Sequence, residues 1–110
     1  MKARAHKRTP VHATIYVWDE IEETLLGQLC NVSPGGLLLL TEQTLPIDAV
    51  FQIRIQPAAT NSFEPFSLGI ETLWTEPGNQ GASFWVGMRV IDASEEGRRR
   101  LVALGAMQAP

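Results

Sequence analysis

Apolar and polar residues alternate with a period of two over most of this chain, which is the pattern of half-buried β-strands. The clearest case is residues 50–56, where Phe51, Ile53 and Ile55 share one face and polar side chains take the other. The same alternation, interrupted by turns, predicts six strands, over residues 11–18, 24–30, 36–40, 50–56, 66–74 and 83–91.

Two of these segments carry a more detailed expectation. Residues 36–40 are apolar enough to be covered on both faces of a sheet. In residues 66–74, the alternation assigns one inward face to Phe66, Leu68, Ile70, Thr72 and Trp74.

The period changes after residue 91, where a helix is expected to begin. Residues 92–95, Asp-Ala-Ser-Glu, fit a capping box, and Ser94 is a competing N-cap. An apolar stripe follows through about residue 106 and is made of Leu101, Val102 and Leu104. The sequence therefore predicts a mainly β fold, a six-stranded antiparallel (split) β-barrel with a C-terminal α-helix.

Length and composition indicate one domain, since 110 residues that are 45% apolar can bury a core of their own. The single cysteine, Cys30, excludes an intrachain disulfide, and its apolar surroundings predict a small buried residue rather than a nucleophile. No apolar stretch approaches 18 residues, and none follows the charged N-terminus. We therefore expect a cytoplasmic protein with neither a signal peptide nor a membrane span.

Charge is divided unevenly along the chain. Residues 1–8 carry +4 and the rest carries −7, which gives the net charge of −3. We expect residues 1–9 to form a flexible basic arm, and residues 10–110 to form the barrel with its helix. A basic arm on an acidic body argues against a nucleic-acid binder, which needs a broad basic face. It favours a small anionic ligand or an acidic partner.

The composition offers little support for catalysis or metal binding. Asp19, Glu20, Glu22 and Glu23 lie close together, but without histidines or a calcium-loop glycine they indicate a solvated turn. There is no nucleophile–base pair, zinc spacing or Walker-type loop, so we expect neither an enzyme nor a metal cofactor.

Residues 31–36, Asn-Val-Ser-Pro-Gly-Gly, separate two apolar runs. Pro34 has no N–H to give to a sheet, so the preceding strand is expected to stop at this segment. Asn31 and Ser33 can bond the local backbone or a ligand, and Gly36 leaves its backbone open to close approach. Taken alone, the segment indicates an ordinary hairpin loop.

The order of motifs along the chain resembles the PilZ domain family. The motifs are Arg4-x-x-x-Arg8 before the first strand, then Asn31-x-Ser33-x-x-Gly36 after the second. Trp74 and the segment 86–90, Val-Gly-Met-Arg-Val, also look like the family, although Val90 stands where Phe is common. The resemblance covers roughly residues 2–106.

This resemblance implies a receptor for cyclic di-GMP, a bacterial second messenger, with no other cofactor. The implied ligand-binding residues are Arg4, Arg8, Asn31, Ser33 and Gly36. Asn31 stands where the family often has Asp, and Ala3 stands where an Arg or bulky residue is common, so affinity and stoichiometry stay open. Binding is expected to order the arm and to signal to an unidentified effector protein, in motility or biofilm regulation.

Two alternatives stay open. One is a PilZ-fold interaction module, a pilus or secretion accessory that does not bind the nucleotide. Such members usually lack the arginine pair that this chain has. The other is a β-barrel that binds nucleic acid, which the −7 charge of the body opposes.

Overall fold

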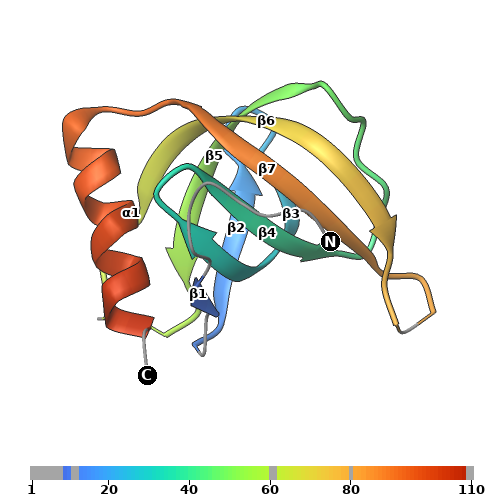
Figure 1. The fold of residues 1–110 in the computed structure, drawn as a ribbon, viewed down its shortest axis with the longest axis horizontal. Coiled ribbons are helices and arrows are strands. Elements are labelled where there is room, and N and C mark those ends of the chain that lie inside the picture. Colours follow the sequence, from blue (N-terminus) through green and yellow to red (C-terminus); the bar gives the residue numbers. More distant parts are fainter. Residues whose placement is uncertain (1–8, 11–12, 60–61, 80, 109–110) are drawn as a thin grey trace.

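The computed structural model describes residues 9–10, 13–59, 62–79 and 81–108 (Figure 1). Strands precede a single helix in the described chain, as the alternation predicts. The elements are β1 (Thr9–Pro10), β2 (Ile15–Asp19), β3 (Thr24–Ser33), β4 (Gly36–Thr41), β5 (Val50–Pro57), β6 (Phe66–Pro77), β7 (Phe84–Asp92) and α1 (Glu95–Gln108).

The sheet closes on itself. The strand order is β1-β3-β2-β5-β6-β7-β4, and β4 also pairs with β3, so that β2 to β7 form a ring of six. Every pairing is antiparallel. The predicted six-stranded antiparallel barrel with a C-terminal helix is therefore confirmed. The short β1 is an addition, paired with the part of β3 that extends beyond β2.

The predicted first strand, residues 11–18, begins too early. β2 starts at Ile15, Ala13 and Thr14 are not in a strand, and residues 11–12 lie outside the described part. The arm predicted over residues 1–9 also lies outside it, apart from Thr9 in β1. That arm stays a prediction.

The core consists of side chains that point into the barrel. Ile53 and Ile55 of β5 are fully buried, as their alternation predicts, and Leu101 and Leu104 of α1 are 2% exposed. Val102 is 55% exposed, so its place in the predicted stripe is wrong. Successive residues of an α-helix are rotated by about 100°, so Val102 does not share the face of Leu101 and Leu104 and points away from the barrel.

Ser94 is the N-cap of α1, and this decides between the two predicted caps. The backbone N–H of Gly97 donates to Ser94 Oγ at 2.9 Å, the usual N-cap bond. The two glycines of α1 face neighbouring atoms of the barrel. A Cβ at Gly97 would lie 3.3 Å from the Ser67 carbonyl oxygen, and one at Gly105 would lie 3.4 Å from Val32 Cγ2. In Figure 1 the helix stands beside the barrel on the side of β1.

Bulges interrupt the alternation in three strands, and one of them lies at Ile91 of β7 against β6. The register of β3 shifts at Leu26 against β2 and at Cys30 against β4, and that of β6 shifts at Leu73 against β7. A bulge adds one residue, and the residues beyond it face the opposite side from the one that strict alternation gives. Three predictions about which side chains are buried are wrong, and they concern residues at these bulges or on the outer surface.

The first failed expectation concerns Cys30, which is half-buried rather than buried. The second concerns β4, where Leu38 and Leu40 are half-buried because no further layer covers them fully. The third concerns Trp74, which does not share the inward face of Thr72.

Candidate functional site

Asn31 and Ser33 lie on a strand and not in a loop. β3 continues through Ser33, and Pro34 and Gly35 alone join it to β4. The prediction that the strand stops before Asn31 is wrong. Pro34 lies beyond the last residue pair, Ser33 with Gly36, so its missing N–H costs the ladder nothing.

The Cys30 bulge places Asn31 and Ser33 on the outer face of the barrel. Leu29 and Val32 are each 1% exposed and face the core, whereas Asn31 and Ser33 are half-buried. Ser33 Oγ donates a long hydrogen bond of 3.5 Å to the Gly36 carbonyl oxygen. Within the described residues, the Asn31 side chain has no hydrogen-bond partner. Both side chains therefore have capacity for a ligand.

The chain that follows the arginine pair lies next to this strand. Thr9 pairs with Val32, and Pro10 pairs with Asn31. The predicted ligand residues Arg4 and Arg8 lie outside the described residues.

A first row of cross-strand neighbours runs over the outer face from Asn31. Asn31 pairs with Leu38, Leu38 with Gly87, and Gly87 with Trp74. A Cβ at Gly87 would collide with the Trp74 indole, so this ring lies across Gly87 on the outer surface. The Leu73 bulge explains why, since Trp74 faces away from the core that Thr72 enters. The alternation of apolar and polar residues along β6 did not predict that Trp74 lies on the outer surface.

A second row runs parallel to the first from Ser33. Ser33 pairs with Gly36, Gly36 with Arg89, and Arg89 with Glu71. Arg89 donates from Nε and Nη2 to Glu71 Oε1, at 3.2 and 2.5 Å. Arg89 lies in the segment 86–90 that resembles the family, but the sequence alone predicts no ligand contact for it. The observation that points to Arg89 is its pairing with Gly36, the glycine of the motif.

Gly36 is needed by the barrel itself. It is buried, and a Cβ there would lie 2.6 Å from the Met88 carbonyl oxygen of the neighbouring strand. Only glycine fits this close approach of β4 to β7 without a shift of the backbone. A role of Gly36 toward a ligand stays a prediction beside this packing role.

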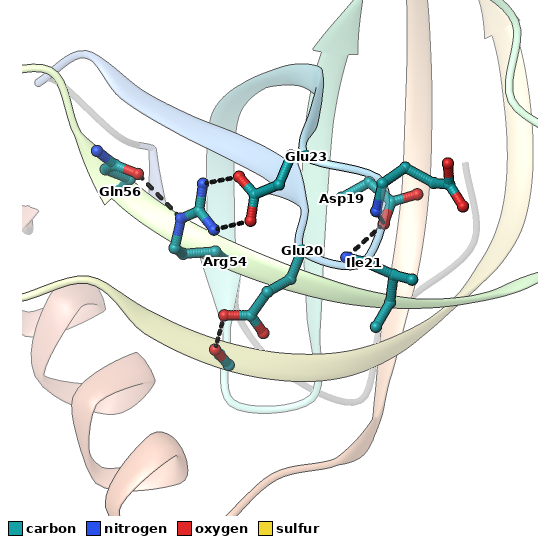
Figure 2. Close-up of polar contacts among 8 residues, drawn as sticks. Asp19, Glu20, Ile21, Glu23, Arg54 and Gln56 are labelled. Carbon is teal, nitrogen blue, oxygen red and sulfur yellow. Dashed lines mark hydrogen bonds and ion pairs between the residues drawn. The ribbon is translucent and has the colours of Figure 1, made fainter.

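The acidic turn between β2 and β3 is ordered by its own contacts (Figure 2). Asp19 Oδ1 accepts hydrogen bonds from the backbone N–H groups of Ile21 and Glu22, at 3.0 and 3.1 Å. Glu23 accepts two hydrogen bonds from Arg54, at 2.9 and 3.0 Å, and these bonds hold the Glu23 pKa below its usual value.

Glu20 and Cys30 are also poor candidates for chemistry. Glu20 accepts a hydrogen bond from Ser67 Oγ at 2.8 Å. Burial raises the pKa of the Cys30 thiol, which disfavours the thiolate that a nucleophile needs. Across the described ranges, no group of three or more His, Cys, Asp or Glu side chains could hold a metal ion.

A groove of about 470 Å³ opens farther along the outer face of β2, β3 and β4. Tyr16, Gln28 and Leu40 line it as cross-strand neighbours, together with Thr41 and Gln43 near its end. Asn31, Ser33 and Gly36 are not among its lining residues. The candidate site is thus an open face rather than this groove.

Comparison with known proteins identifies a family model that matches this chain and several solved structures with a similar fold. The model of the PilZ domain matches residues 2–105. The PilZ domain with c-di-GMP of YcgR from Escherichia coli is similar, with a TM-score of 0.72 and 15% identity over 97% of this chain and 92% of that one. No curated protein matches this chain. In the described residues, the helix α1 is not long and apolar enough to cross a membrane.

Two longer solved structures have the same fold in part. Bacillus subtilis Inhibitor of motility (MotI/DgrA) has a TM-score of 0.72 and 11% identity, over 97% of this chain and 51% of that one. YcgR in complex with c-di-GMP from Escherichia coli has a TM-score of 0.72 and 16% identity, over 94% and 45%. This chain therefore spans about half the length of these two. The family match over residues 2–105 and the shared barrel agree, and the chain belongs to the PilZ domain family.

Proposed function

We propose that this chain is a receptor for cyclic di-GMP rather than an enzyme. The ligand-binding residues in this proposal are Arg4, Arg8, Asn31, Ser33 and Gly36. PilZ is a ligand-binding domain family, and the similar YcgR structures contain c-di-GMP. A receptor for a second messenger works in the cytoplasm, which is the location that we propose.

The observation that carries the proposal is the pairing of β1 with β3. Thr9 pairs with Val32, which lies between Asn31 and Ser33. Arg8 directly precedes Thr9, and a trans peptide separates their Cα atoms by about 3.8 Å. Arg4 is four residues farther away, at most about 13 Å along an extended chain. One ligand on this face is therefore within reach of both motifs.

The two motifs supply complementary chemistry. Cyclic di-GMP carries two phosphates and two guanines, and an arginine fork can bind either a phosphate or the O6/N7 edge of a guanine in bidentate fashion. The arm contributes donors, whereas the N–H groups of a guanine need an acceptor. Asn31 Oδ1 is such an acceptor, and it has no other partner among the described residues. Ser33 Oγ, which holds only a 3.5 Å hydrogen bond, can turn toward a phosphate.

Ligand binding is expected to order the arm, and this ordering supplies the signal. Fixing a free backbone costs about 1–2 kcal/mol per residue, and a micromolar complex leaves about −8 kcal/mol net. Charged hydrogen bonds of about 1.5–3 kcal/mol each offset that cost. An effector protein would then recognise the ordered arm, and motility is the process that the name of the similar Bacillus protein suggests.

Calorimetric titration with cyclic di-GMP, beside GMP, tests the proposal. We expect saturable binding by the wild type and its loss in an Arg4→Ala/Arg8→Ala variant. The control is Arg98→Ala/Arg99→Ala, which removes the same charge from the exposed face of α1 and should bind normally. A folded wild type that gives no heat at high micromolar ligand would overturn the receptor. The PilZ-fold interaction module would then be the better description.

A further inference from the structure

We propose that Arg89 is a further ligand-binding residue, whose guanidinium binds a phosphate of cyclic di-GMP over Gly36. This inference rests on the proposed function and extends its site from β3 to β7. It adds a cation that is part of the barrel itself rather than of the N-terminal arm.

The register places Arg89 on the same face as Ser33. Directly opposed residues of antiparallel strands point to the same side, and Ser33, Gly36 and Arg89 are opposed in turn. The neighbouring row, Val32, Leu37 and Met88, is at most 1% exposed and faces the core. The row of Ser33 therefore faces outward at each strand.

Ser33 and Arg89 lie two strands apart, on either side of Gly36. Two strand spacings separate their Cα atoms by about 10 Å. Gly36 lies between them and has no side chain to fill the gap. An extended arginine side chain spans most of such a distance, so an anion that accepts from Ser33 Oγ also comes within reach of the guanidinium.

Arg89 is held in place but keeps donors to spare. Its side chain is 58% exposed, and it binds Glu71 through Nε and Nη2 alone. A guanidinium has five N–H donors, and Nη1 has no hydrogen-bond partner in the described part of the chain. Glu71 lies on β6, on the side of β7 away from Gly36, so the guanidinium reaches an anion over Gly36 through Nη1 or after turning from Glu71 toward β4.

The simpler explanation is a surface ion pair that links β6 to β7. Exposed pairs of this kind typically contribute about 0–1 kcal/mol to stability, so replacing Arg89 would then change neither stability nor ligand affinity by much. The two explanations differ in their effect on ligand affinity, because an ion pair with Glu71 gives no reason for affinity to change.

The test compares Arg89→Gln with Arg99→Gln in titrations with cyclic di-GMP. Arg99 is a matched control, since it forms an exposed ion pair with Glu96 at 2.5 Å and has 64% side-chain exposure. We expect Arg89→Gln to raise Kd about tenfold, equivalent to about 1.4 kcal/mol, and Arg99→Gln to leave it unchanged. The affinity of Arg89→Gln should also depend less on salt, because one charge contact with the ligand is lost.

Thermal unfolding of each variant separates binding from folding. If Arg89→Gln does not fold, Arg89→Lys carries the test, and its Kd should still exceed that of the wild type because lysine has no planar fork. Wild-type affinity in a folded Arg89 variant would overturn this inference while leaving the receptor intact, provided that Arg4→Ala/Arg8→Ala abolishes binding. No binding by the wild type would overturn the receptor, and the role of Arg89 with it.

Discussion

Replacing Gly36 with alanine should destabilise the barrel even in the absence of any ligand. The new Cβ would lie 2.6 Å from the Met88 carbonyl oxygen. Gly36 and Met88 both belong to the β4–β7 ladder, in which Gly36 pairs with Arg89 and Leu37 with Met88. The collision is therefore between two backbones, and a side-chain rotation cannot relieve it.

The expected magnitude follows from this geometry. Overpacking a closely packed region typically costs about 1–3 kcal/mol, since the backbone must shift. For a domain of this size, 1 kcal/mol lowers Tm by about 4–8 °C. We therefore expect Gly36→Ala to lower the free energy of unfolding by about 2 kcal/mol, and Tm by about 10 °C.

Urea denaturation, followed by tryptophan fluorescence, measures this loss against Gly105→Ala. A Cβ at Gly105 meets Val32 Cγ2 at 3.4 Å, an ordinary contact, and alanine is favoured over glycine inside a helix by about 0.8–1 kcal/mol. The two glycine-to-alanine changes should thus have opposite signs. A Gly36→Ala protein with the unfolding free energy of the wild type would refute the packing argument and leave the ligand as the reason for this glycine.

Two further outcomes concern stability. Thr72→Val should cost about 1–3 kcal/mol in urea denaturation, because the fully buried Thr72 hydroxyl donates to the Pro46 carbonyl oxygen at 2.6 Å and accepts from the Ala49 N–H at 3.1 Å. A variant as stable as the wild type would contradict this. Glu23→Gln should be less stable than the wild type at pH 7. Hydrogen bonds from Arg54 lower the folded-state pKa of Glu23, so its contribution is complete above the unfolded value of about 4.3 and disappears as pH falls through the folded value. A stability difference that persists at pH 2 would refute this origin.

The sequence predicted the barrel well because its strands are bounded by clear turn signals. Ile53 and Ile55 are fully buried, as their alternation requires. The positions of Trp74 and Cys30 could not be predicted, because the residue at which a strand bulges is set by its pairing with a second strand, which the alternation of one strand does not specify. The helix cap could be narrowed to two candidates, and a single hydrogen bond to Ser94 decides between them.

The spacing of the family motif has a direct geometric meaning in this hairpin. A two-residue loop pairs the residue before it with the residue after it, so Ser33 must oppose Gly36. Asn31, two positions before Ser33, then lies on the same face of the strand. Asn-x-Ser-x-x-Gly thus encodes two polar side chains on an outer face and one position across from them that has no side chain.

The pairing of Gly36 with Arg89 continues this arrangement onto the next strand. The packing of β4 on β7 requires a residue without a side chain at Gly36, and the proposed anion lies over this residue, between Ser33 and Arg89. Barrel packing and ligand access therefore favour the same residue for independent reasons. The Gly36→Ala and Arg89→Gln variants separate them, since the first should change stability and the second should change affinity.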